Sequence, residues 1–404
     1  MKKFKIVFLG CPKNLVDTEY LIGSLIKRGF EYSNKGEYVF IQTCAFIKDA
    51  VCESYKVIKK YVEKKKRGEI KFIGVGGCLP LRLKNKILEE FPEIDLIIKN
   101  EFTSPRFFLT KGFAYLKISE GCNEKCSFCL IPSIKGDLKS KTIEEIIKEV
   151  ELLLNLGFKE IILISQSTGQ YGIDIYKKPY FKNLLKEIDK INKDFWIRIM
   201  YMHPADIDEE LIEIIKNSDK IVKYMDIPIQ HFSSNVLKNM KRRGGKEKVL
   251  RALEIIRKEF DDNFFIRSEV IVGFPGENER DFEELLKGIE YYKINRIAIF
   301  KYSDEKEINI KKVPKKIINE RFLEVEKLAR KLMEESQKKL LGKKLKCLII
   351  EENKNFYKGR TEFDAPEIDF EVYTKKSFKI EIPGFYTLKI KSMKENFDLE
   401  GKIC

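Results

Sequence analysis

The chain has 404 residues, which suggests two or three domains at roughly 150 residues per domain. Its net charge of +15 suits an anionic partner such as RNA or a ribosome, although Lys- and Glu-rich surfaces also accompany growth at high temperature. It contains no run of about 18 apolar residues, and its first residues lack the long apolar stretch of a signal peptide. We therefore expect no membrane span and a cytoplasmic protein.

The first hundred residues alternate between strand-like and helix-like runs. The pattern predicts strands at residues 4–9, 38–42, 72–75 and 95–98, and helices at 15–27, 49–66 and 83–90. This order predicts a small parallel sheet. Three of the strands run into a cysteine, Cys11, Cys44 or Cys78, and sites of such sheets lie at the carboxyl ends of the strands. The thiols either converge on one edge as a three-thiol site or are three separate buried cysteines.

From residue 115 the alternation repeats with a longer period. Strands are predicted at 115–119, 160–165, 196–201, 222–227, 264–272 and 296–302, with helices at 142–155, 182–190, 209–216, 246–259 and 279–291. Six β/α units indicate a partial (β/α)6 barrel. A charged helical tether at 313–340 follows. Short runs at 345–350, 370–374, 378–382 and 386–392 then predict a small antiparallel β-barrel.

The loop after the first barrel strand carries three closely spaced thiols. Cys122, Cys126 and Cys129 have a Cys-x-x-x-Cys-x-x-Cys spacing, and barrel active sites lie at this end of the strands. A 4Fe-4S cluster held by three thiolates leaves one iron open to a small molecule. With this spacing the small molecule is usually S-adenosylmethionine (SAM), whose reductive cleavage gives a carbon radical. The alternative is a structural zinc site, which prefers two Cys-x-x-Cys pairs or a Cys/His mixture, and no fourth ligand lies close.

The nine cysteines agree with such chemistry, because an odd number argues against a disulfide framework. Two further segments are candidates for contact with SAM. Gln166 stands at a strand end, either as a SAM contact or as an ordinary polar loop residue. The turn containing Gly273, Pro275 and Gly276 follows the fifth barrel strand, and it either approaches the adenosine or simply ends the strand.

Several segments closely resemble motifs of the radical-SAM methylthiotransferases. They are Leu9-Gly10-Cys11-Pro12-Lys13-Asn14, Ile41-Gln42-Thr43-Cys44-Ala45-Phe46, Gly76-Gly77-Cys78, the 121–129 loop with Ile131-Pro132, Tyr224-Met225-Asp226-Ile227-Pro228-Ile229-Gln230-His231 and Ile271-Val272-Gly273-Phe274-Pro275-Gly276-Glu277. The resemblance runs over essentially the whole chain. It implies an N-terminal methylthiotransferase domain at 1–105, a radical-SAM barrel at 112–335 and a TRAM β-barrel at 336–404.

The resemblance also implies an enzyme with two 4Fe-4S clusters and SAM as cofactors. The metal ligands would be Cys11, Cys44 and Cys78 for an auxiliary cluster, and Cys122, Cys126 and Cys129 for the cluster that binds SAM. One SAM would supply the methyl group and a second would supply the radical that removes hydrogen from the substrate carbon. A radical is needed because such a C–H bond is too weakly acidic for a side-chain base. A reducing electron donor and a sulfur donor are implied as further partners.

Two subfamilies differ in substrate. One modifies adenosine in tRNA, and the other modifies the β-carbon of an aspartate in the twelfth protein of the small ribosomal subunit. The Cys11-Pro12-Lys13-Asn14 motif and residues 359–369 are typical of the second, which is our prediction, with the free protein or the assembled subunit as partner. The 13 basic and 11 acidic residues at 341–404 agree with a protein substrate better than with RNA. The acidic side chains Glu362, Asp364, Glu367 and Asp369 either meet basic groups of that protein or lie in a solvated loop.

Four positions depart from the family pattern. Lys135 and Lys141 stand where Arg is usual, Ser167 where an acidic residue is usual, and His203 where an aromatic residue is common. Lys cannot bind a carboxylate with two parallel hydrogen bonds as Arg does, so these departures affect contacts with SAM and substrate. A non-enzymatic iron–sulfur or ribosome-binding protein is the alternative from another class. The three-thiol loop argues against it, because an electron carrier uses four thiolates.

Overall fold

A computed structural model describes residues 2–84, 86–99 and 105–404, which fall into two units. The first unit consists of the residues up to 109 together with residues 120–123 and 129–138. The second comprises 110–119, 124–128 and 139–404. Cys126 therefore belongs to the second unit, whereas Cys122 and Cys129 belong to the first. Across the described residues, no helix has the length and apolar character needed to span a lipid bilayer.

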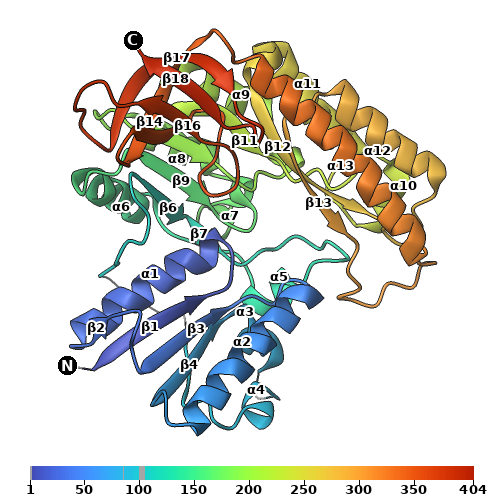
Figure 1. Cartoon of the computed structure of the whole chain (residues 1–404). Coiled ribbons are helices and arrows are strands. Elements are labelled where there is room, and N and C mark those ends of the chain that lie inside the picture. The colour runs from blue at the N-terminus through green and yellow to red at the C-terminus, as the bar shows by residue number, and fades with distance from the viewer. Residues whose placement is uncertain (1, 85, 100–104) are drawn as a thin grey trace. The chain divides into compact units, whose positions relative to one another are not determined.

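The first unit is built on a parallel five-stranded sheet in the order β2-β1-β3-β4-β5 (Figure 1). Its strands are β1 (Lys3–Phe8), β2 (Glu31–Tyr32), β3 (Tyr38–Thr43), β4 (Phe72–Gly77) and β5 (Leu96–Ile97). Its helices are α1 (Pro12–Lys27), α2 (Lys48–Lys66), α3 (Cys78–Leu83), α4 (Lys86–Glu90) and α5 (Ile131–Lys135). The parallel α/β arrangement predicted from the sequence is confirmed.

Both faces of this sheet are covered by helices. On β3, Val39 and Ile41 pack in one apolar cluster with side chains of α2, whereas Phe40 packs in another with side chains of α1. Because successive side chains of a strand point to opposite faces, α1 and α2 lie on opposite sides of the sheet. A central parallel strand covered on both faces reads as a continuous apolar run, as Val39-Phe40-Ile41 does.

The second unit contains a parallel six-stranded sheet in the order β13-β12-β11-β10-β9-β6, which does not close. Its strands are β6 (Phe113–Lys117), β9 (Glu160–Ile164), β10 (Trp196–Ile199), β11 (Ile221–Asp226), β12 (Phe265–Val272) and β13 (Arg296–Lys301). The intervening helices are α6 (Ile143–Asn155), α8 (Phe181–Asp189), α9 (Glu209–Asn217), α11 (Gly245–Phe260) and α12 (Glu279–Tyr291). The predicted partial barrel is confirmed.

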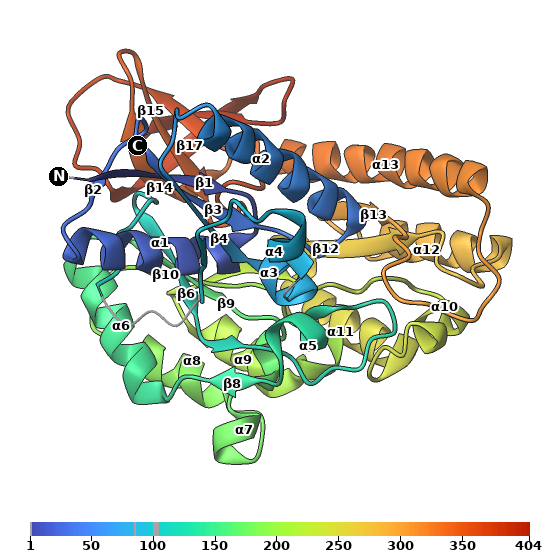
Figure 2. The ribbon, with the colours of Figure 1, turned by 90° about the horizontal axis from the view of Figure 1, so that it is seen from below.

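Shorter elements fill the loops, and a long helix follows the last strand. The short elements are β7 (Ser119–Glu120), β8 (Lys139–Ser140), η1 (Thr168–Gln170), α7 (Ile173–Tyr176), η2 (Pro204–Asp206), α10 (Ser234–Asn239) and η3 (Asp261–Asn263). Helix α13 (Lys315–Lys338) occupies the predicted tether and lies beside β13 (Figure 2).

The chain ends in a closed five-stranded barrel, here called the terminal barrel. Its order is β14 (Lys344–Glu352), β15 (Phe356–Thr361), β16 (Val372–Lys375), β18 (Leu399–Ile403) and β17 (Gly384–Met393). All its pairings are antiparallel except that of β16 with β18. The strand predicted at 378–382 is wrong, because these residues form a loop and no edge of the closed barrel is left for them to pair with.

Strand β15 places a charged side chain among the strands of the partial barrel. Glu160 is fully buried, and its carboxylate accepts hydrogen bonds from Arg198 Nε at 2.6 Å and from Arg360 Nε at 2.8 Å. Burial opposes ionisation of Glu160, but the two arginines outweigh it and lower its pKa. Arg198 therefore pairs within the barrel, and Trp196 packs against Phe385 with the rings tilted at 54° and their centroids 4.9 Å apart.

Two of the acidic residues expected at the substrate surface are internal instead. Asp364 is 1% exposed and lies 3.0 Å from Arg296 Nη2. Asp369 accepts from Tyr224 Oη at 2.6 Å and from Arg267 Nη1 at 3.2 Å. The expectation that these two carboxylates meet a partner protein is wrong. Their arginine partners are inside the barrel, and leaving these charges unpaired would cost more free energy than the carboxylates could recover by binding another protein.

Candidate active site

Cys11, Cys44 and Cys78 all follow carboxyl ends of parallel strands. Cys44 comes directly after β3 and Cys78 directly after β4, and the last residues of these strands, Thr43 and Gly77, pair in register. Cys11 precedes α1 as its N-cap, shortly after the neighbouring strand β1. Topology therefore brings the three cysteines to one edge of the sheet.

The backbone around Cys78 is shaped by close contacts at this edge. Gly77 has φ +84°, and a Cβ there would lie 2.3 Å from the carbonyl oxygen of Thr43, so only glycine fits. Thr43 Oγ1 accepts a hydrogen bond from Leu79 N at 3.2 Å. Asn14 Nδ2 donates to Thr43 O at 3.0 Å and lies 3.9 Å from Cys78 Sγ. These contacts fix where α3 begins, and with it the Cys78 thiol.

The three thiols influence one another electrostatically. Burial raises the pKa of Cys44, and Cys11 raises it further. Burial raises the pKa of Cys78 to about 11, with Lys135 opposing and both other thiols adding to the rise. Within the described ranges, no three Cys, His, Asp or Glu side chains are placed so that they could together hold a metal ion. The thiols fit an iron–sulfur cluster in donor type, they share one edge of the sheet, and binding the cluster would displace their protons.

Lys135 is a buried cation near this thiol set. Its Nζ lies 2.6 Å from Glu120 Oε1 and 3.6 Å from Asp17 Oδ2, and its side chain is 5% exposed. Burial alone would lower the pKa of Lys135, but Asp17 and Glu120 outweigh it and raise the pKa above its usual value. The ammonium group therefore keeps its charge and lowers the pKa of Cys78, a role that does not need the planar group of the usual Arg.

In the first unit, the two ends of the cysteine loop are tightly constrained. Gly121 has φ +81°, and a Cβ there would lie 2.0 Å from the carbonyl oxygen of Asp137. Cys122, which follows it, is 6% exposed. The backbone N–H of Ile131 points at Cys129 Sγ with a nitrogen–sulfur distance of 3.5 Å. Amide donors of this kind stabilise thiolates that ligate iron–sulfur clusters.

In the second unit, Cys126 is held by the segment that follows α10. Ser127 N donates to Met240 O at 3.0 Å, and Ser127 Oγ donates to Asn239 O at 2.8 Å. Arg242 Nη1 lies 3.6 Å from Cys126 Sγ, which is a charged donor to a sulfur atom. A charged donor at the sulfur atom is the kind of contact that orients a cysteine ligand of a metal cluster.

Gln166 lies at the carboxyl end of β9, as predicted. Its Oε1 is buried and has no hydrogen-bond partner among the residues that the structure describes, and the same holds for Ser167 Oγ. Buried polar atoms in native proteins are nearly always paired, so two orphans side by side indicate a ligand that binds there. Whether that ligand is SAM stays a prediction.

The turn containing Gly273, Pro275 and Gly276 follows β12. Gly273 has φ +77°, and a Cβ there would lie 2.3 Å from Ile318 Cγ1 of α13. Its N–H donates to Glu277 Oε2 at 2.9 Å. Packing against α13 explains the glycine at 273 without a ligand, so contact between this turn and SAM stays a prediction.

Sequence reasoning missed two arginines after α10. Arg243 bridges Glu124 and Asp206, with nitrogen–oxygen distances of 2.7 Å to each. Arg242 contacts Cys126 Sγ and donates to Pro228 O. The two adjacent arginines can be read in the sequence, but a chain with so many basic residues gives no reason to single them out.

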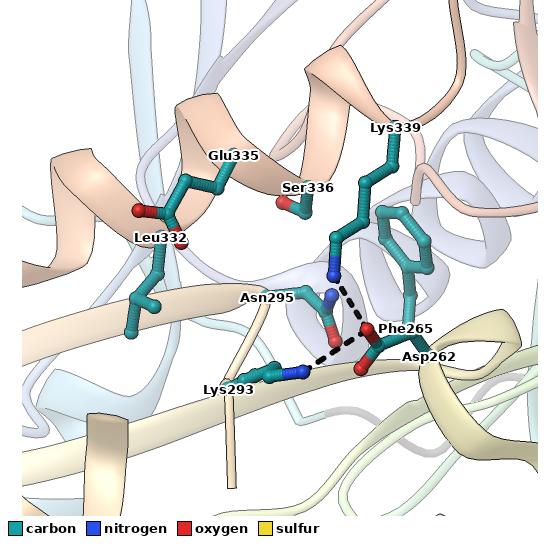
Figure 3. Close-up of a pocket in the computed structure, with 8 residues that line it drawn as sticks. All are labelled: Asp262, Phe265, Lys293, Asn295, Leu332, Glu335, Ser336 and Lys339. Atoms are coloured by element: carbon teal, nitrogen blue, oxygen red, sulfur yellow. Dashed lines mark hydrogen bonds and ion pairs between the residues drawn. The ribbon is translucent and has the colours of Figure 1, made fainter. Parts of the chain in front are cut away.

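Two cavities of the second unit lie away from the cysteine loop. One, of about 20 Å³, is lined by Phe265 and Asn295 at the amino ends of β12 and β13, where Lys339 and Lys293 contact Asp262 at 2.5 and 3.2 Å (Figure 3). It has room for about one water molecule. The other, of about 700 Å³, is an open hollow beside Gly112, before β6. Both are at the strand ends opposite those that carry the predicted site.

Three protein families match successive parts of the chain. The Uncharacterized protein family UPF0004 matches residues 3–99, the Radical SAM superfamily matches 116–289, and the TRAM domain matches 341–404. The radical SAM methyltransferase TsrM from Kitasatospora setae, solved with cobalamin and a [4Fe-4S] cluster, is similar in fold. Its TM-score is 0.53 at 12% identity, over 74% of this chain and 72% of that one.

Curated relatives match along the whole chain. The ribosomal protein uS12 methylthiotransferase RimO of Thermosipho melanesiensis is 40% identical over 429 residues, which cover 99% of each protein. The protein of the same name from Clostridioides difficile is 37% identical over 441 residues, covering 100% of this chain and 99% of the relative.

Proposed function

Because the chain belongs to the RimO family of radical-SAM methylthiotransferases, we propose that it adds a methylthio group to the β-carbon of an aspartate in ribosomal protein uS12. It is an enzyme that uses SAM and an iron–sulfur cluster. The observation that carries the proposal is that one chain holds two separate three-thiol sets. One is at the edge of a parallel sheet, and the other is in the first loop of a partial barrel.

We assign the six cysteines of these sets as metal ligands. They are Cys11, Cys44 and Cys78 for an auxiliary 4Fe-4S cluster and Cys122, Cys126 and Cys129 for the cluster that binds SAM. When bound, these groups supply the electron for reductive cleavage of SAM and the sulfur for transfer. The chain positions them with Gly77 and Gly121, whose turns admit no side chain. It keeps Lys135 charged beside one set and Arg242 beside the other.

The overall chemistry requires further partners. Replacing a C–H bond by a C–S bond with a methyl group on sulfur needs a sulfur atom that neither SAM nor the aspartate contributes. A sulfur donor must therefore restore the enzyme, and a reducing protein or small reductant must supply electrons. A ribosomal substrate, free or within the small subunit, places the enzyme in the cytoplasm.

The test is to offer two substrates in parallel. The anaerobically reconstituted enzyme is incubated with SAM, a reductant and either uS12 or unmodified tRNA, and both are then weighed by mass spectrometry. We expect a methylthio gain on one aspartate of uS12 and none on tRNA. A gain on tRNA adenosine alone would overturn the aspartate assignment and keep only the reaction class.

Two controls separate failure of the enzyme from failure of the proposal. Cys122→Ala, which removes a proposed ligand of the SAM-binding cluster, should form no product with either substrate. A uS12 variant with asparagine at the modified aspartate tests whether the carboxylate is needed. If neither substrate gains mass while SAM is still cleaved to 5′-deoxyadenosine, the substrate lies outside both subfamilies.

A further inference from the structure

His203 presents a hydrogen-bond donor that nothing in the described structure uses. It follows β10 at the carboxyl end of the barrel and is 5% exposed. Its Nδ1 accepts a hydrogen bond from Ala205 N at 3.1 Å, so the ring proton is on Nε2. Nε2 is buried and has no partner among the described residues. Burial and the charges of Arg242 and Arg243 lower the pKa of His203 to about 2, so the ring stays neutral.

Arg242 supplies a cation to the same region. The neighbouring Arg243 forms ion pairs with two carboxylates, Glu124 and Asp206, at 2.7 Å each. Arg242 contacts Cys126 Sγ at 3.6 Å and donates to Pro228 O, and no carboxylate within the described ranges pairs with it. A guanidinium has five N–H donors, and the contacts with Cys126 Sγ and Pro228 O leave others for an incoming anion.

The two groups are held close together by neighbouring contacts. The Arg243–Asp206 ion pair ties the segment after α10 to η2, of which His203 is the N-cap. Gln170 Nε2 donates to Asp206 Oδ1 at 2.9 Å, which ties the loop after β9 to the same point. That loop carries Ser167, whose Oγ lacks a partner.

The residue at 167 also sets the charge of this region. This chain has serine at 167, so this position supplies no carboxylate. A resident carboxylate would repel a second one or satisfy the arginine itself. With serine at 167 and a neutral histidine at 203, the local charge comes from Arg242, and the unused hydrogen-bonding groups are the imidazole N–H and a hydroxyl.

We propose that His203 and Arg242 form a carboxylate-binding subsite at the mouth of the barrel, with the imidazole N–H and the guanidinium donating to one carboxylate. The subsite rests on the proposed function, in which two reactants carry such a group. These are SAM, through its methionine moiety, and the target aspartate. The chemistry of the subsite is the same for both sources, and a binding measurement distinguishes them.

The test measures equilibrium binding to the reconstituted enzyme without turnover. His203→Phe keeps an aromatic ring of similar size and removes the donor, and Arg242→Gln removes the charge. Loss of a hydrogen bond to a charged group weakens binding roughly tenfold or more. Arg251→Gln is the matched control, because it makes the same charge change on α11, where Arg251 pairs with Glu209 at the surface.

Two results support the subsite and identify its ligand. If the subsite binds SAM, both variants weaken the Kd of SAM about tenfold and leave the Kd of decarboxylated SAM unchanged. If it binds the aspartate, the Kd of SAM is unchanged. The Kd of uS12 then rises about tenfold, and the preference for aspartate over an asparagine variant of uS12 is lost.

The proposal is overturned if both variants bind SAM and uS12 as tightly as the wild-type enzyme. Iron content and thermal unfolding of each variant show whether it has folded and loaded. Should Arg242→Gln lose iron because of its contact with Cys126, His203→Phe remains decisive, since it leaves the charge beside the sulfur in place. These measurements need no product, so they stand apart from the test of the reaction itself.

Discussion

Neutralising Asp369 tests whether the terminal barrel completes the interior of the partial barrel. Asp369 comes from the segment after β15, and its side chain is 1% exposed. It accepts hydrogen bonds from Tyr224 Oη at 2.6 Å, Ala365 N at 2.9 Å and Arg267 Nη1 at 3.2 Å. The substitution Asp369→Asn keeps the volume of the side chain and one acceptor oxygen, so it removes mainly the charge.

The expected cost follows from the arginine left behind. Removing one partner of a buried ion pair costs roughly 3–5 kcal/mol, because the other charge stays buried. Asp226 Oδ1 lies 3.7 Å from Arg267 Nε and compensates in part, so we expect about 3 kcal/mol. For a unit of this size, about 1 kcal/mol shifts Tm by roughly 2 °C. The variant should therefore melt about 5 °C below the wild-type enzyme.

The assay is thermal unfolding followed by far-ultraviolet circular dichroism, with both proteins reconstituted in the same way. Glu395→Gln is the matched control, because it makes the same charge change at an exposed position between β17 and β18. Its Tm should move by less than about 2 °C. Hydrogen exchange of β11 and β12 should also quicken in Asp369→Asn, since both strands contribute partners of this carboxylate. Equal melting of the two variants would refute the reasoning.

Other substitutions test the candidate site. Cys122→Ala should abolish formation of 5′-deoxyadenosine, whereas Cys44→Ala should leave it and stop sulfur insertion, and full sulfur transfer by Cys44→Ala would contradict the auxiliary cluster. Gly121→Ala should lose bound iron, because its Cβ would lie 2.0 Å from a carbonyl oxygen, whereas Gly157→Ala, with φ +88° but nothing within 4 Å, should retain it. The native His203, with a pKa of about 2, binds no proton near pH 5, but the unfolded chain does so below about pH 6.5. Stability should therefore fall by ~1.5 kcal/mol more in the wild type than in His203→Phe between pH 6.5 and pH 5. Urea unfolding at both pH values measures this, and equal losses would contradict it.

The positions of Cys11, Cys44 and Cys78 could be predicted because parallel topology converts distant sequence positions into neighbours. Each follows a strand, adjacent strands run in one direction, and their ends therefore meet. What the sequence alone left open was whether three thiols at one edge interact or merely fill space. The structure places all three at the carboxyl edge of one sheet, and their joint binding of a cluster stays a prediction.

The terminal barrel was harder to predict in detail. Residues 378–382 alternate as a strand does, but Pro383 follows them and the barrel closes without them. The strand that was missed, β15, contains Gly359, where a Cβ would lie 2.1 Å from the carbonyl oxygen of Leu348. A glycine inside a strand reads as a turn in sequence, whereas here it permits close backbone approach.

The buried pairs of Asp364 and Asp369 were unpredictable because their partners lie on other strands. Arg296 begins β13 and Arg267 is the third residue of β12, and an arginine near the start of a strand is usually exposed. Only the closed arrangement shows that the segment after β15 supplies their counter-charges.

This pairing changes what the charge of the terminal barrel means for substrate choice. In the sequence, a near-neutral balance favours a basic protein over RNA as the substrate. In the structure, however, two of the acidic residues in that balance, Asp364 and Asp369, neutralise buried arginines of the partial barrel. The charge of the terminal barrel therefore does not distinguish a protein substrate from tRNA. That distinction must come from residues at the mouth of the partial barrel. An adenosine has no carboxylate, so a His203–Arg242 subsite that binds the substrate would select aspartate directly. If the subsite instead binds SAM, it would serve either substrate equally. The binding measurement on His203→Phe thus decides whether aspartate specificity is built into the mouth of the barrel or must come from contacts with the rest of uS12.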